Sequence, residues 1–128
     1  MKIIFFILLV IFSLGCAKEI YVSNGETIYR TGKNKNGKKL LDKGRSQITF
    51  VKSCQGCHGK AGDRNSNCII KWSSLSDPNK HSVPYTDFLF FRFLDKDLKS
   101  DGSHAETGVH WNLSTEDQKD LMEYLKKL

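Results

Sequence analysis

The 128-residue sequence predicts one small all-α domain of about three to four helices. Two observations lead to this prediction. Residues that favour helix N-termini stand at Ser23, Thr86 and Ser114, and apolar residues recur at helical spacing after Thr86 and Ser114. The sequence contains neither a βαβ pattern nor an internal repeat, so a parallel sheet or a repeat architecture is not expected.

The first 15 residues have the features of a secretory signal peptide. Lys2 precedes an apolar run over residues 3–14, which is too short to span a bilayer comfortably but fits the apolar part of such a peptide. Gly15 and Cys16 resemble the end of a bacterial lipobox, although Ser13 stands where leucine is usual. We therefore expect export to the periplasmic side of a bacterial membrane, with Cys16 lipidated and residues 16–23 forming a tether. Ordinary signal cleavage nearby, which would leave Cys16 absent or free, is the alternative.

A short helix is expected to follow the tether. Ser23 and Glu26 match the S-x-x-E capping box, and the helix should direct Ile28 and Tyr29 into the core before it ends near Gly32. The next segment, residues 33–47, is rich in glycine and asparagine and is predicted to be irregular. We call it the basic loop, because Asp42 is its only acid among six cations: Lys33, Lys35, Lys38, Lys39, Lys43 and Arg45.

The chemistry of the chain is concentrated in residues 54–58, which read C-x-x-C-H, the arrangement that attaches haem covalently. Cys54 and Cys57 are three residues apart, so on a helical turn they face the same way and can each add to one vinyl group of a porphyrin. His58 follows directly and can present its imidazole to the iron. Half of a zinc site is a weaker interpretation, because Cys68 and scattered histidines would have to complete it. A thioredoxin-like redox pair is weaker still without a βαβ pattern.

Beyond this motif, residues 59–63 are expected to form a turn that lets the backbone pass close to the porphyrin. If haem consumes two cysteines and lipid consumes Cys16, Cys68 has no partner within the chain. We predict that Cys68 is a small buried hydrophobic residue, with pairing to another molecule as the alternative. Trp72 is expected to pack rather than to act in catalysis, and residues 77–84 should form another loop.

Two longer helices are predicted in the second half of the chain. The first begins after Thr86 and continues to about Leu98 as a buried amphipathic helix, because charged residues interrupt its aromatic run. Residues 103–112 lack periodicity and should form a loop. The last helix begins at a capping box of Ser114 and Asp117. Its apolar face recurs at helical spacing: Leu121, Tyr124, Leu125 and Leu128.

With these features in place, residues 24–128 resemble the class I c-type cytochromes, small electron carriers with one haem. The resemblance rests on residues 54–59 and on the closing stretch 113–126, which ends in Tyr-Leu-Lys as the last helix of the family typically does. It implies the small cytochrome c fold, in which the first and last helices cross near one edge of a single covalent haem c. It also implies that Cys54 and Cys57 form the thioethers and that His58 is the proximal axial ligand.

The chain departs from this family at the second axial ligand. The family usually places a methionine before the last helix, close to where Thr107 stands here, and this chain has none there. His110 and, after it, His104 are the leading candidates for the distal ligand, because they flank that position. Met122, His81 and an open site are the remaining alternatives, although Met122 is expected to pack within its helix. A histidine in place of methionine would lower the reduction potential, whereas an open site would admit small ligands.

We therefore expect a membrane-tethered monohaem electron carrier rather than an enzyme. The sequence shows no paired carboxylates and no nucleophile with its base, and we expect no small-molecule substrate. A haem-based module that binds or senses a diatomic gas is the main alternative. A third hypothesis is that the chain is the cytochrome subunit of a larger oxidoreductase.

The net charge of +6 bears on the partners of the protein. We interpret the basic loop first as a solvated surface loop. Its functional alternative is docking to an acidic redox partner protein or to anionic lipid near the anchor. Nucleic acid is not expected as a partner, because an exported protein seldom meets it and the loop lacks aromatic residues for base stacking.

Overall fold

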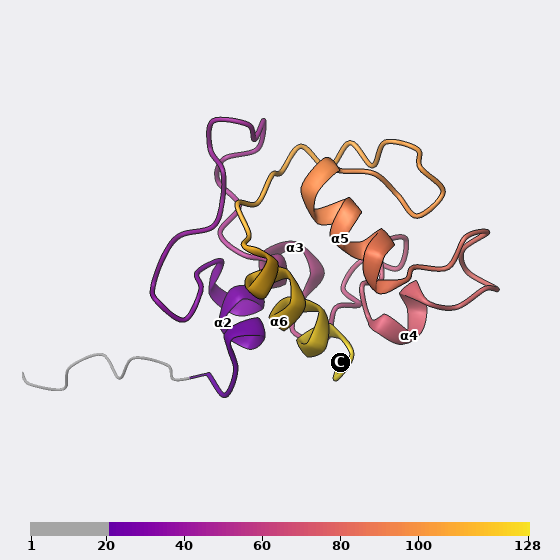
Figure 1. Ribbon diagram of the computed structural model, residues 1–128, viewed down its shortest axis with the longest axis horizontal. Coiled ribbons are helices and arrows are strands. Elements are labelled where there is room, and N and C mark those ends of the chain that lie inside the picture. Colours follow the sequence, from indigo (N-terminus) through magenta and orange to yellow (C-terminus); the bar gives the residue numbers. More distant parts are fainter. Residues whose placement is uncertain (1–20) are drawn as a thin grey trace, which may run out of the picture.

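The computed structural model describes residues 21–128 and folds them into five α-helices joined by long connections (Figure 1). Within these residues, β-type pairing is limited to isolated bridges, which confirms the predicted all-α class. The helices are α2 (Asn24–Thr31), α3 (Cys54–His58), α4 (Trp72–Leu75), α5 (Asp87–Lys96) and α6 (Thr115–Leu125). The predicted signal peptide, the lipidation site Cys16 and most of the tether lie outside the described residues. None of the described helices is long and apolar enough to cross a membrane.

The first predicted helix is confirmed in α2. The side chain of Ser23 accepts a hydrogen bond from the Glu26 amide at 3.1 Å, which caps the N-terminus. Gly32 ends the helix in the left-handed conformation, where a residue without a Cβ atom avoids a steric penalty. Ile28 and Tyr29 are 1% and 0% exposed, so both enter the core as predicted.

α6 crosses α2 at Gly25 (Figure 1). A Cβ atom on Gly25 would collide with the backbone carbonyl of Asp120 and would lie 2.9 Å from the Cβ atom of Tyr124. Beside this crossing, Nδ2 of Asn24 donates hydrogen bonds to Oδ1 of Asp117 at 3.1 Å and to Oδ2 of Asp120 at 2.8 Å. The absence of a side chain at Gly25 therefore lets the first and last described helices meet backbone to backbone.

The last helix also agrees with its prediction. Both hydrogen bonds of the capping box between Ser114 and Asp117 are present at the start of α6. Leu121, Met122 and Leu125 are each no more than 3% exposed. Met122 therefore packs in the core, as expected for a residue within this helix.

α5 begins as predicted but ends earlier. The side chain of Thr86 caps its N-terminus by accepting a hydrogen bond from the Leu89 amide at 3.3 Å. The helix stops at Lys96 rather than near Leu98, because Asp97 turns the backbone into the left-handed region with φ 54°. The predicted burial is only partly right, since Phe90 is 5% exposed but Phe88 is 72% exposed.

Two parts of the core were not predicted. Leu40 lies within the basic loop and is 0% exposed, so this loop is not wholly solvated. The short helix α4 follows the loop after α3 and buries Leu75. Trp72, at the start of α4, packs its ring edge-on against Phe90 with centroids 5.9 Å apart, which confirms its packing role.

Candidate cofactor site

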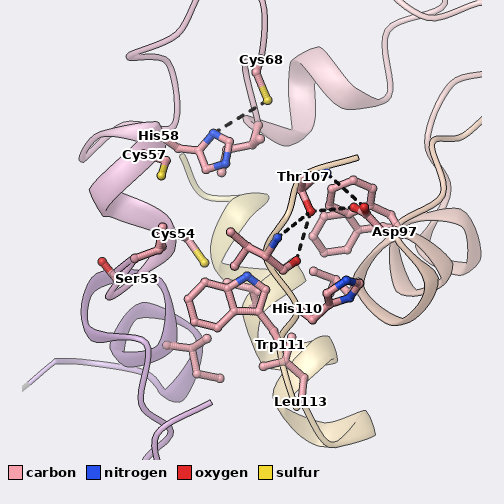
Figure 2. A pocket seen from close by; sticks show the side chains of 18 residues that line it. Ser53, Cys54, Cys57, His58, Cys68, Asp97, Thr107, His110, Trp111 and Leu113 are labelled. Carbon is pink, nitrogen blue, oxygen red and sulfur yellow. Dashed lines mark hydrogen bonds between the residues drawn. The ribbon is translucent and has the colours of Figure 1, made fainter. Parts of the chain in front are cut away.

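The single turn of α3 brings the residues of the C-x-x-C-H motif to one cavity (Figure 2). The side chain of Ser53 caps this turn by accepting a hydrogen bond from the Gly56 amide at 3.3 Å. Cys54, Cys57 and His58 all line the cavity, whose volume is about 310 Å³. Small-molecule and cofactor pockets typically measure roughly 300–1,000 Å³, so this volume falls at the lower end of that range.

Most of the remaining cavity wall is apolar. Its side chains come from α2, α5, α6 and the segments that precede α3, α4 and α6: Ile28, Val51, Ile70, Phe90, Phe93, Leu94, Val109, Trp111, Leu113 and Leu121. A porphyrin is a large, flat and mainly apolar group, and burying apolar surface stabilises the folded chain. The residues present therefore fit a haem held at Cys54 and Cys57.

The two cysteines of the motif differ in exposure. Cys57 is exposed, whereas Cys54 is only partly accessible. Burial raises the pKa of the Cys54 thiol, and the nearby Cys57 adds to this shift. The Cys54 sulfur therefore carries its hydrogen at neutral pH. A protonated thiol supplies both the sulfur and the hydrogen that are needed for addition across a vinyl group.

His58 is held in the form that can coordinate a metal. Burial lowers the pKa of its imidazole, and a hydrogen bond with the backbone of Cys68 opposes this shift without reversing it. A neutral imidazole keeps a lone pair for a metal ion. Sγ of Cys68 lies 4.0 Å from Nδ1 of His58 (Figure 2), so the contact with this thiol involves Nδ1 and not Nε2.

The prediction that Cys68 is buried is wrong. Cys68 is exposed, and it lines the cavity beside His58. It lies in the loop after α3, where its backbone amide donates a hydrogen bond to the carbonyl of Asn65 at 3.0 Å. This local turn places the thiol over the imidazole and the mouth of the cavity instead of in the core.

The structure separates the two histidines proposed as distal ligands. His110 lines the cavity, whereas His104 is exposed and belongs to a neighbouring polar pocket that also includes His110. Figure 2 shows the imidazoles of His58 and His110 well apart, with His58 beside Cys68 and His110 on the side of the cavity where Asp97 lies. The alternatives His81 and Met122 are not among the residues that line this cavity. The geometry therefore favours His110 among the described candidates.

The segment that carries His110 is held by hydrogen bonds along its length. We call residues 107–112 the distal strap, because four of them line the cavity: Thr107, Val109, His110 and Trp111. The amide of His110 donates to Oγ of Ser46 at 2.9 Å, and its carbonyl accepts from the Asp42 amide at 2.9 Å. Three further hydrogen bonds join the strap to residues 40–48. The amides of Gln47 and Ile48 donate to the Gly108 carbonyl at 2.9 and 3.0 Å, and the Asn112 amide donates to the Leu40 carbonyl at 2.7 Å. Residues 40–48 thus support the strap.

Comparison with known proteins does not assign the chain to a family. No protein-family model, no curated protein and no solved structure matches it.

The basic loop, which includes most of the residues that support the strap, also carries positive charge. Lys35 pairs with Glu116 at 2.7 Å, and Arg45 pairs with Asp42 at 2.7 Å. Four other cations of the loop are exposed and form no ion pair within residues 21–128: Lys33, Lys38, Lys39 and Lys43. The loop therefore combines a structural role toward the strap with a positively charged surface.

Trp111 and Asp97 are among the cavity residues that reasoning from the sequence missed. Trp111 stands in a segment without periodicity and reaches the cavity through an isolated bridge with Leu41, which no local pattern indicates. Asp97 ends α5 and also lines the cavity. Aspartate tolerates the left-handed conformation better than most residues, so Asp97 could have been recognised as a helix end but not as a cavity residue.

Proposed function

We propose that the chain is a monohaem c-type cytochrome that carries single electrons between redox partner proteins. The observation that supports this most directly is the convergence of Cys54, Cys57 and His58 on one largely apolar cavity. His110 lines the same cavity and would provide a second nitrogen ligand. Haem bound there would supply one-electron chemistry between Fe(III) and Fe(II).

Each residue of the motif has a distinct role in this proposal. Cys54 and Cys57 would hold a haem through thioether bonds, and each thiol would add its sulfur and its hydrogen across one vinyl group, so no oxidant would be needed. His58 would bind the iron through Nε2, while its Nδ1 lies toward Cys68. The apolar wall keeps water away from the bound group and so contributes to its reduction potential.

The residue that binds the second axial position affects the reduction potential of the haem. With His110 as the second ligand, both axial atoms are imidazole nitrogens, and the reduction potential should be lower than with methionine and histidine. Cys57 is exposed, so one edge of the site lies near the surface, where a redox partner can approach. The unpaired lysines of the basic loop favour a partner with an acidic surface.

The proposed location follows from the sequence of residues 1–16. The signal peptide would export the chain, and a lipid on Cys16 would hold it at the periplasmic side of a bacterial membrane. Incorporation of labelled palmitate by the wild-type chain, and its loss in Cys16→Ser, is the expected result. Equal labelling of the two chains would contradict an anchor at this residue.

Intact-mass analysis tests covalent attachment. The wild-type chain, expressed with c-type maturation machinery, should carry the mass of one haem. Cys57→Ala should lose stable double attachment, and His58→Ala should retain little usable haem. Cys68→Ala is the matched control, because Cys68 lines the same cavity outside the motif, and it should keep the full haem mass. A wild-type protein without haem would overturn the proposal.

Absorption spectra of paired histidine variants test the distal ligand. His110→Ala should convert the oxidised spectrum from low spin to high spin and should raise the reduction potential. His104→Ala is the control, because His104 is exposed and lies outside the cavity, and its spectrum should match the wild type. A wild-type spectrum in His110→Ala would exclude that residue as ligand.

The absence of a methionine from the lining residues is the observation that keeps gas binding as a second candidate function. Carbon monoxide distinguishes the two, because it needs a vacant coordination position. Rapid binding to the reduced wild-type protein at neutral pH would favour the gas-binding module over a six-coordinate electron carrier.

A further inference from the structure

Asp97 joins the end of α5 to the start of the distal strap. Its amide donates to the Phe93 carbonyl at 2.9 Å and closes the helix in the left-handed conformation. Its carboxylate accepts two hydrogen bonds from Thr107, one from the amide at 3.0 Å and one from the hydroxyl at 2.7 Å (Figure 2). Both residues line the cavity.

The loop between these two residues is closed by other bonds. The Ala105 amide donates to the Asp97 carbonyl at 2.8 Å, and the Lys99 amide donates to the Ser103 carbonyl at 2.8 Å. Arg92 on α5 also donates to the Lys99 carbonyl at 2.8 Å. The carboxylate of Asp97 is therefore not the only group that shapes this loop, and its distinct contribution is to fix the first residue of the strap.

Thr107 is three residues before His110, whose backbone is fixed at Ser46 and Asp42. The strap segment from Thr107 to His110 is thus anchored on α5 at one end and on the basic loop at the other. Thr107 is exposed, so the bonds to Asp97 lie where solvent reaches the mouth of the cavity. Breaking them would release the strap on the α5 side while the other anchor remains.

We propose that Asp97 and Thr107 are positioning residues that latch the distal strap and so keep His110 over the sixth coordination position of the iron. This inference rests on the proposed haem function. Neither residue coordinates iron in this arrangement. Their effect reaches the iron through the position of His110 and through access of external ligands to the site.

Carbon monoxide binding to the reduced holoprotein tests the latch. Thr107→Val removes the hydroxyl bond to Asp97 and also the contacts of this hydroxyl with the Val109 carbonyl and amide at 3.1 and 3.4 Å. Thr107→Ser keeps all of these bonds and should behave as the wild type. Asp97→Asn keeps the shape and tolerates the left-handed conformation but replaces one acceptor oxygen with a donor. Thr107→Val and Asp97→Asn should each raise the carbon monoxide association rate about threefold or more, as expected when a hydrogen bond of ordinary strength is lost. Both should also increase the high-spin fraction of the oxidised spectrum.

The matched control lies in the same loop. The Asp101 side chain accepts hydrogen bonds from the amide and hydroxyl of Ser103 at 2.9 and 2.7 Å, but Asp101 does not line the cavity. Asp101→Asn should therefore leave the association rate unchanged. Wild-type rates in both latch variants, or an equal increase in Asp101→Asn, would overturn the proposal.

Amide hydrogen exchange gives a readout that does not depend on haem. In the apo chain, Asp97→Asn should reduce the protection of the Thr107 amide about threefold or more relative to wild type and to Asp101→Asn. If exchange changes as expected but the wild-type chain carries no haem, the latch exists and the proposed function fails. Unchanged exchange at Thr107 in Asp97→Asn would refute the latch itself.

Discussion

Replacing Gly25 by alanine should destabilise the protein, because this glycine lies where α2 and α6 cross. The added Cβ atom would collide with the carbonyl of Asp120 and approach the Cβ atom of Tyr124 to 2.9 Å. Overpacking typically costs about 1–3 kcal/mol, and alanine regains up to about 1 kcal/mol through its higher helix propensity. A backbone carbonyl cannot rotate away as a side chain can, so the upper part of the range applies. We expect a net loss of about 2 kcal/mol.

Urea and thermal unfolding of the holoprotein measure this loss. For a domain of this size, about 2 kcal/mol corresponds to a fall in melting temperature of roughly 10 °C. Gly44→Ala is the control, because its nearest neighbour would be Oδ1 of Asp42 at an ordinary 3.4 Å, and its stability should stay within about 0.5 kcal/mol of wild type. A Gly25→Ala protein as stable as Gly44→Ala would refute the close crossing of the two helices.

Three other residues give independent tests. The exposed Cys68 thiol should react with a maleimide in the folded holoprotein, and labelling seen by mass spectrometry only after denaturation would contradict its placement. Tyr29→Phe should lower the free energy of unfolding in urea by about 1–3 kcal/mol, because the fully buried hydroxyl donates to the Gly59 carbonyl at 2.6 Å; equal stability would show that this bond contributes nothing. Burial opposes ionisation of Asp117, yet hydrogen bonds, including one from Asn24, hold its pKa below the ordinary 3.8. Because the folded-state pKa is lowered, this stabilisation is present above the ordinary value and is lost as the pH falls below it. Asp117→Asn should therefore reduce the pH dependence of stability between about pH 5 and about pH 2, and an unchanged pH dependence would contradict the assignment.

The helices with clear starting signals could be predicted from the sequence. Ser23, Thr86 and Ser114 each cap a helix through a bond that spans only three residues, so the pattern and the structure report the same local chemistry. The end of α5 could not be placed in the same way, because Leu98 continues the apolar spacing after Asp97 has already turned the backbone. Periodicity therefore indicated the helix but not where it stops.

A contact between distant residues accounts for one error, and a local turn accounts for the other. Leu40 is fully buried although its neighbours in sequence are mostly charged or small, and its carbonyl accepts a hydrogen bond from the Asn112 amide at the far end of the chain. The sequence predicts that Cys68 is a small buried hydrophobic residue, yet a local turn directs its thiol toward His58. The apolar spacing of the neighbouring residues indicates neither placement.

In the candidate site too, local spacing predicts some residues and only long-range contacts place the others. Cys54, Cys57 and His58 share one helical turn, so their convergence follows from their spacing. His110 and His104 could not be separated by sequence, since they stand in one loop without periodicity. Hydrogen bonds with residues 42–48, which lie 60 or more positions earlier in the chain, fix the strap and bring His110 rather than His104 to the cavity.

The anchoring of the distal strap allows residue 110 to be replaced without moving the backbone around it. The bonds that hold it to residues 40–48 use the main-chain atoms of Gly108, His110 and Asn112, and none of them uses the imidazole of His110. The side chain at position 110 can therefore be varied while the backbone that presents it stays in place. The protein is thus suited to a series of variants in which one side chain alone changes, such as His110→Met, so that differences in potential report the ligand and not a rearranged fold.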